Sequence, residues 1–322
     1  MDSRARFLLF LRIMMTRKLF ACAAVAALAI LGPAGLARGM EGRAWGDIHV
    51  QTMDGAVYDF QAAGEYVASR STDGDFEVQL RLESTGFSSF VSIVTAVAVL
   101  VDTTRASVNL GREPMLSIDG RPAALAPAES LDLAGGGRIE RSQRGYEVFW
   151  GDGSSLCIDV RKRHLNAFLR PALTRRNTLS GLFGNFNGKT MDDINAAAAI
   201  GTLASGSGSD LQPVLTELAR SLFSNEDDGW VVAQHTSLFE YAPGQNTRTF
   251  RRPAPTREAT AAGLPASWRR NAQAACEEAG VSDPGLLEAC IVDVGYTRDE
   301  SFAETAAAVQ ARNGADWESA PE

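Results

Sequence analysis

Apolar and polar residues alternate in the first half of the chain. Between residues 75 and 83, apolar side chains occupy every second position from Phe76 to Leu82, with Glu77 and Arg81 between them. A period of two is typical of a strand with one buried face, so we expect Glu77 and Arg81 to face solvent. Residues 90–101 form a longer apolar run rich in Val and Ile, which predicts a buried strand because β-branched side chains favour extended backbone.

Shorter segments continue this pattern. Strands are predicted at residues 107–110, 115–118, 138–141, 146–150 and 156–161, and turn sequences such as Asp119-Gly120 separate them. Many short strands about ten residues apart are typical of two packed antiparallel sheets. The fold class predicted for this half is therefore mainly β, an antiparallel β-sandwich.

A different pattern follows residue 190. Residues 268–279 have a helical pattern that ends at Gly280, and Asp283-Pro284 starts a second helix that continues to Val292. Four prolines in residues 243–266 indicate a linker. The predicted organisation is a signal peptide at 1–37, a β-sandwich domain at 38–242, a linker at 243–266, a small helical hairpin module at 267–302 and a flexible, Ala-rich acidic tail at 303–322.

The N-terminal segment has the features of a secretory signal. Arg17 and Lys18 precede an apolar stretch that runs from Leu19 to Leu31, and small residues at 35 and 37 predict cleavage after Ala37. The apolar stretch is shorter than the roughly 20 residues that a membrane span needs. We therefore expect a secreted protein, extracellular or periplasmic, with membrane contact only through the signal segment if it is uncleaved.

Charge and cysteine content agree with that location. The chain has a net charge of −8, and removal of residues 1–37 takes away five basic groups and one acid, which leaves −12. An acidic chain excludes nucleic acid as the expected partner, because phosphates require a basic surface. Cys276 and Cys290 flank a turn and are expected to pair in an oxidising compartment. Cys157 is either a small buried strand residue or half of an intermolecular disulfide.

The segment Gly181–Ile194 carries the main candidate chemistry. Asn185 and Asn187 alternate, and the paired Asp192 and Asp193 follow a turn at Gly188. Hard cations such as calcium take six to eight oxygen ligands of these kinds. The residues alone leave a plainer alternative open, in which Asn187-Gly188 is a hairpin turn and an aspartate caps the next helix.

Two ordered motifs resemble those of the von Willebrand factor type D domain. The first comprises Trp45-Gly46-Asp47-Ile48-His49, Thr52-Met53-Asp54-Gly55, Tyr58-Asp59-Phe60 and Gly64-Glu65-Tyr66-Val67, and the second is the segment from Gly181 to Asp193. The resemblance covers about residues 45–240, and the module with Cys276 and Cys290 is more loosely similar to the cysteine-rich module that follows type D domains. The resemblance to the type D domain implies a structural calcium ion. The ligands carried over by position are Asp47, Asn185, Asn187, Asp192 and Asp193.

The chain departs from the family pattern at positions that matter. Ile48 replaces the proline of an Asp-Pro bond at which some relatives cleave themselves, so we predict no self-cleavage. Phe183 replaces a cysteine of the closing motif. Since the disulfide frame of the animal domains is largely missing, we interpret the chain as a bacterial-type member, and covalent polymerisation is not expected.

Catalytic motifs are missing from the sequence. His49, His164 and His235 have no metal-ligand spacing, and neither a G-x-S-x-G nor an H-E-x-x-H motif occurs. We therefore expect a non-enzymatic, calcium-stabilised interaction or adhesion protein that binds an unknown extracellular protein or glycan. The alternative is an extracellular hydrolase whose catalytic site carries no recognisable motif.

Overall fold

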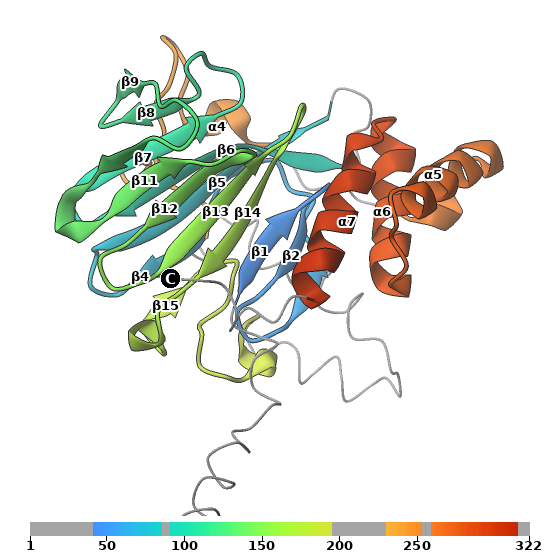
Figure 1. Ribbon diagram of the computed structural model, residues 1–322, viewed down its shortest axis with the longest axis horizontal. Coiled ribbons are helices and arrows are strands. Elements are labelled where there is room, and N and C mark those ends of the chain that lie inside the picture. Colours follow the sequence, from blue (N-terminus) through green and yellow to red (C-terminus); the bar gives the residue numbers. More distant parts are fainter. Residues whose placement is uncertain (1–40, 86–90, 195–229, 253–254, 256–258, 315–322) are drawn as a thin grey trace, which may run out of the picture. The chain divides into compact units, whose positions relative to one another are not determined.

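The structure is a computed structural model that describes residues 41–85, 91–194, 230–252, 255 and 259–314 (Figure 1). The predicted signal peptide lies outside the described residues. None of the described helices combines the length and the apolar character needed to cross a membrane.

The described residues from 42 to 180 form one antiparallel sheet of fifteen strands. The strands are β1 (Gly42–Trp45), β2 (His49–Gln51), β3 (Val57–Asp59), β4 (Gly64–Ser71), β5 (Phe76–Ser84), β6 (Ser92–Val101), β7 (Thr104–Asn109), β8 (Leu116–Ile118), β9 (Arg121–Ala123), β10 (Ser130–Asp132), β11 (Arg138–Arg141), β12 (Gly145–Phe149), β13 (Ser155–Val160), β14 (Leu165–Arg170) and β15 (Leu179–Ser180). Their order is β10-β11-β12-β13-β14-β6-β5-β4-β15, with β1–β3 branching from β14 and β7–β9 from β6. The predicted antiparallel, mainly β fold is confirmed, and its strands pair in one continuous sheet.

The apolar face of β5 lies in the main core as the alternation predicts. Phe76, Val78, Leu80 and Leu82 have no exposed surface, and β5 pairs with β6 along its whole length. Burial of each such side chain is worth roughly 1.5–3 kcal/mol relative to exposure. This packing holds the strand pair at the centre of the sheet.

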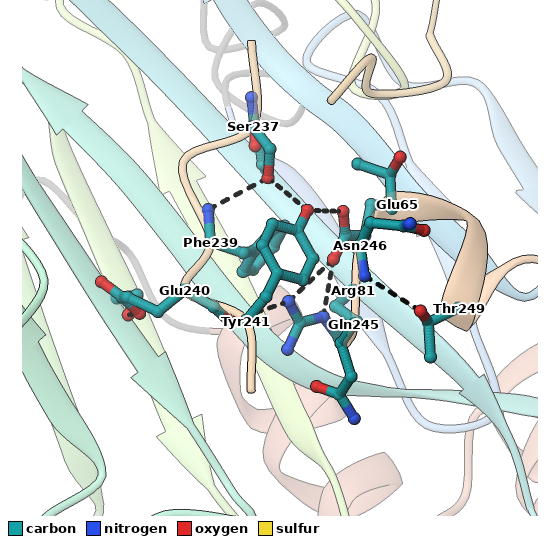
Figure 2. Close-up of polar contacts among 12 residues, drawn as sticks. Glu65, Arg81, Ser237, Phe239, Glu240, Tyr241, Gln245, Asn246 and Thr249 are labelled. Atoms are coloured by element: carbon teal, nitrogen blue, oxygen red, sulfur yellow. Dashed lines mark hydrogen bonds and ion pairs between the residues drawn. The ribbon is translucent and has the colours of Figure 1, made fainter. Parts of the chain in front are cut away.

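The opposite face of β5 is covered as well, which corrects the expectation that Arg81 faces solvent. The Arg81 side chain is 3% exposed, and its Nε donates to Glu65 Oε1 over 2.8 Å. Its guanidinium lies 3.9 Å from the ring centroid of Phe250 and 4.5 Å from that of Phe239. Figure 2 shows Tyr241 reaching the same carboxylate, to which its hydroxyl donates over 2.5 Å. The covering residues come from 230–252, a segment whose short helix α4 (Thr247–Phe250) falls inside the expected linker.

Three helices follow in the chain: α5 (Ala266–Glu278), α6 (Pro284–Thr297) and α7 (Ser301–Gly314). Asp283 caps α6 by accepting from the Leu286 N–H, and Pro284 occupies the first turn, where no N–H partner is needed. The predicted Cys276–Cys290 disulfide is confirmed and joins α5 to α6, with an S–S distance of 2.01 Å. Short 3₁₀ turns lie at Ala134–Gly136, Leu173–Arg175, Thr190–Asp192 and Ala261–Gly263.

The flexible tail expected from residue 303 is wrong for its first twelve residues, because 303–314 belong to α7. Phe302, Ala303, Ala306 and Val309 are each at most 2% exposed. Their spacing places them on one helical face, which packs in a second apolar cluster with the other two helices. Alanine is only weakly apolar, so the sequence pattern did not indicate a buried helical face here. The small alanine side chains nevertheless let the helix pack closely.

The second apolar cluster also contains sheet residues. Trp45 of β1, Ile93 of β6 and Phe168 of β14 join side chains from α5, α6 and α7. His164, which immediately precedes β14, stacks on Phe302 with ring centroids 4.1 Å apart. The helices are therefore packed on the sheet beside β1 and β14, which brings α6 close to the turn that follows β1.

Candidate functional site

The closing segment folds into a tight loop after β15. Leu182 and Phe183 are buried in the main core and anchor its start. Gly184 has φ 83°, and a Cβ atom at this position would collide with Oδ1 of Asp193. Glycine is thus required there both by the backbone conformation and by the approach of the carboxylate.

Four of the predicted calcium ligands meet in this loop. The carboxamides of Asn185 and Asn187 donate to the two oxygens of Asp192 over 3.0 and 2.8 Å. Asp193 accepts from the Asn185 N–H over 3.1 Å and from the Thr52 hydroxyl over 2.5 Å. These four residues, which the sequence analysis grouped as ligands, therefore also lie close together in the structure.

A fifth residue, the acid Asp54, joins them from the turn between β2 and β3. Its carboxylate accepts from the N–H groups of Asn187 and Gly188 over 2.8 and 2.9 Å. Sequence analysis did not assign Asp54 a role, although it lies in the Thr52–Gly55 motif of the opening block. We call Asp54, Asn185, Asn187, Asp192 and Asp193 the closing-loop cluster.

Negative charge accumulates in the closing-loop cluster. Burial raises the pKa of Asp193 to about 7, and the nearby charges of Asp54 and Asp192 act in the same direction. Among the described residues, no lysine or arginine forms an ion pair with these three acids. The side-chain donors are all carboxylate or amide oxygens, which is the ligand set that calcium prefers. The residues present therefore fit such an ion.

Asp47, the remaining predicted ligand, makes its contacts elsewhere. It lies in the turn between β1 and β2, is fully buried, and its Oδ1 lies 3.1 Å from His49 Nε2. The same Nε2 is 3.0 Å from Oδ1 of Asp293 on α6, and His49 Nδ1 is 2.5 Å from Oδ1 of Asp59. Gln61 donates to the backbone carbonyl and to Oδ1 of Asp47. We call Asp47, His49, Asp59 and Asp293 the opening-turn cluster.

Burial dominates the electrostatics of the opening-turn cluster. It raises the pKa of Asp47 well above the usual value, and the neighbouring Asp293 raises it further. Burial by itself would lower the pKa of His49, but the carboxylates of Asp293, Asp59 and Asp47 together bring it well above the usual value. The cluster therefore holds on to protons more tightly than isolated side chains do.

The backbone of this turn is unusual at two positions, on either side of Asp47. Gly46 has φ 62°, its N–H donates to Asn166 Oδ1 over 3.1 Å, and a Cβ atom at Gly46 would collide with Oδ2 of Asp293. Ile48 is fully buried with φ 69°, a conformation that β-branched residues rarely adopt. No sequence signal pointed to Asp293, which is far along the chain, except its place three residues after Cys290 on the same helix.

Cys157 lies in β13, partly exposed and outside any disulfide of the described residues. Burial raises the pKa of its thiol to about 11, and Arg312 donates to its sulfur over 3.2 Å. A thiol with so high a pKa is a poor nucleophile at neutral pH.

Comparison with known proteins agrees with these motifs. The family model for the von Willebrand factor type D domain matches residues 42–198. The chain is similar to zonadhesin of Sus scrofa, with 31% identity over 156 residues that make up 46% of this chain and 6% of that protein. It is 29% identical over 165 residues to hemocytin of Bombyx mori, covering 49% of this chain and 5% of that protein. The IgGFc-binding protein of Homo sapiens is 29% identical over 160 residues, 48% of this chain and 3% of that protein.

These matches share two features. Each relative is many times longer than the matched region, so this chain spans only a small fraction of its length. The matched region in this chain contains the sheet, the opening turn and the closing loop. Residues 42–198 therefore form a von Willebrand factor type D domain.

Proposed function

We propose that this protein is a non-enzymatic extracellular interaction protein, of adhesion type, whose type D domain is stabilised by calcium at the closing loop. The names of two relatives, zonadhesin and IgGFc-binding protein, refer to adhesion and to protein binding. A protein or glycan outside the cell is accordingly the proposed partner. The acidic composition and the predicted secretory signal support the same location.

The closing-loop cluster is the observation that carries the calcium part of this proposal. Asp54, Asp192 and Asp193 would contribute carboxylates, and Asn185 and Asn187 would contribute amide oxygens. A bound calcium ion would neutralise carboxylates that otherwise repel one another. Because Asp54 belongs to the β2–β3 turn and the others follow β15, the ion would fasten two distant segments, and its binding free energy would add to that of folding.

Thermal unfolding of the full chain, in excess chelator and in millimolar calcium, tests this site. Calcium at a hundred times its Kd is expected to stabilise the protein by about 2.7 kcal/mol. The variants Asp54→Asn and Asp192→Asn should lose this response. Asp73→Asn removes an exposed acid from the β4–β5 turn and serves as the matched control.

The variant Asp47→Asn distinguishes the ligand set predicted from the sequence, which includes Asp47, from the closing-loop cluster, which has Asp54 in its place. If the response survives in Asp47→Asn but not in Asp54→Asn, the ion is held by the closing-loop cluster as it stands in the structure. An equal response in the parent and in both closing-loop variants would contradict the calcium site.

The interaction role needs its own assay. Labelled protein would be applied to panels of extracellular proteins and glycans in calcium and in chelator, and in parallel to panels of ester and glycoside substrates. Saturable binding without turnover is expected. Turnover that persists through purification would favour the hydrolase instead.

A further inference from the structure

The opening-turn cluster has the geometry of a transition-metal site. Nε2 of His49 lies 3.1 Å from Oδ1 of Asp47 and 3.0 Å from Oδ1 of Asp293. One ligand atom from each of the three residues lies within 4.8 Å of the others. Ligands bound tetrahedrally to Zn²⁺ at about 2.0–2.1 Å are roughly 3.3 Å apart, so the two distances from the imidazole nitrogen to the carboxylate oxygens are close to those of a coordinating arrangement.

Asp59 supplies the support that such a histidine requires. A carboxylate accepts hydrogen bonds, so the contact of 2.5 Å between Asp59 and His49 Nδ1 places a hydrogen on Nδ1. Nε2 is thereby directed at Asp47 and Asp293. Metal-binding histidines commonly have a carboxylate on their other nitrogen, because it fixes the ring and makes the ligating nitrogen more basic.

An unsatisfied atom gives independent support. Asp47 has no exposed surface, and within the part of the chain that the structure describes its Oδ2 accepts no hydrogen bond from an N–H or hydroxyl group. A buried carboxylate oxygen without a hydrogen-bond donor is destabilising, because it has lost its hydration and no protein hydrogen bond replaces it. Among the described residues, no lysine or arginine pairs with Asp47 or Asp293. A cation at this place would supply both the missing charge and the missing contact.

The geometry points to a second metal site that is separate from the proposed calcium site. We infer that the opening-turn cluster binds one first-row divalent cation, with Zn²⁺ as the representative, through His49, Asp47 and Asp293. Calcium does not suit this position, because it takes six to eight oxygen ligands and the cluster offers an imidazole and two buried carboxylates. Binding displaces to solvent the proton that Nε2 otherwise shares with the carboxylates.

This metal would join the sheet to the helices. Asp47 lies in the turn after β1 and His49 begins β2, whereas Asp293 is on α6, which the Cys276–Cys290 disulfide already fixes to α5. Gly46 leaves the space that the Asp293 carboxylate fills. The ion would therefore cross-link α6 to the sheet through side-chain ligands, in addition to the disulfide that links α6 to α5.

Zinc titration of the full chain, with its disulfide formed and without an affinity tag, tests the inference. Metal would first be removed with a chelator, and calcium would then be kept at millimolar concentration so that the closing loop is filled. Calorimetry is expected to show one Zn²⁺ per chain. The variants His49→Gln and Asp293→Asn should weaken binding by at least about 100-fold, and Asp59→Asn by roughly 10–100-fold because it removes only the supporting contact.

Two controls keep the result interpretable. Glu288→Gln removes an exposed acid from the same helix as Asp293 and should bind Zn²⁺ as the parent does. Asp54→Asn alters the closing loop and should also retain Zn²⁺ binding, so failure of the calcium proposal would not affect this one. Because buried variants can misfold, Co²⁺ bound to the unmodified protein provides a further readout. Its visible absorption should show a low-coordinate site with a nitrogen ligand.

The inference is overturned if the unmodified protein binds no Zn²⁺, or if folded His49→Gln binds it as tightly as the parent. A Co²⁺ spectrum typical of six oxygen ligands would overturn it as well. In that case His49 and the three acids form only a buried ion-pair network.

Discussion

The opening-turn cluster and the closing-loop cluster differ in how their charges are satisfied. Asp47 and Asp54 belong to the same opening segment and are separated by β2. Asp47 is fully buried against His49 and Asp293, whereas Asp54 is partly exposed and accepts backbone N–H groups of the closing loop. A buried carboxylate needs a positive partner inside the protein, while a partly exposed one can share solvent and backbone donors. The two clusters should therefore respond differently to loss of a single member.

The largest effect is expected for His49→Ala. Removal of the imidazole leaves Asp47 and Asp293 side by side in the interior without their positive partner. Breaking a buried ion pair in this way destabilises a protein by about 3–5 kcal/mol. Urea unfolding, with exposed His235→Ala as the control, would measure the loss. A loss below about 1 kcal/mol would show that the opening-turn cluster does not need the histidine.

An intermediate effect is expected from His164, which also lies between the sheet and the helices but for which burial outweighs the effect of nearby carboxylates. Burial lowers its pKa to about 4, and its Nε2 lies 2.9 Å from the hydroxyl of Thr305. The unfolded chain binds a proton near pH 6.5, whereas the folded chain resists it until about pH 4. Stability is therefore retained above pH 6.5 and is lost as the pH falls from 6.5 to 4, by up to about 3 kcal/mol.

Unfolding free energies of the parent and of His164→Gln between pH 4 and pH 7 would check this contribution. The variant should lose less stability on acidification than the parent, because it has no imidazole to protonate. Exposed His235→Gln should follow the parent curve. Parallel curves for parent and His164→Gln would show that His164 does not control the acid response.

The smallest effect is expected for Asp192→Asn without calcium. Asp192 is partly exposed, and an asparagine keeps most of its size and one of its two acceptor oxygens. The unfolding free energy in chelator should change by no more than about 0.5 kcal/mol, as is usual for surface substitutions. A much larger loss in chelator would mean that the closing loop depends on this charge even without an ion, which would remove the contrast between the clusters.

Local patterns predicted the strands well. The alternation at 75–83 corresponds to β5, and the apolar run at 90–101 corresponds to β6 at Ser92–Val101, because the period of side chains is a property of the strand itself. The burial of Arg81 was missed because its cover comes from residues 230–252, over 150 positions away. Alternation says which face is apolar but not whether another segment covers the polar one.

The candidate sites show the same limit. The closing loop was found because Asn185, Asn187, Asp192 and Asp193 are neighbours in sequence. Asp293 was not found, since its approach to His49 depends on how α6 packs beside β1, and that packing rests on apolar contacts spread along the chain. Asp54 and Asp47 were equally available in the opening motif, and only the turns around β2 decide which of them reaches the loop.

Ile48 has a consequence for how this domain can change by mutation. Its φ of 69° lies far from the value near −65° that the proline ring imposes. A single codon change that introduced the relatives' Asp-Pro bond would therefore also have to rebuild the turn around Asp47 and His49. The conformation of this turn therefore disfavours proline at position 48, and it would protect the predicted lack of self-cleavage against mutation at this position.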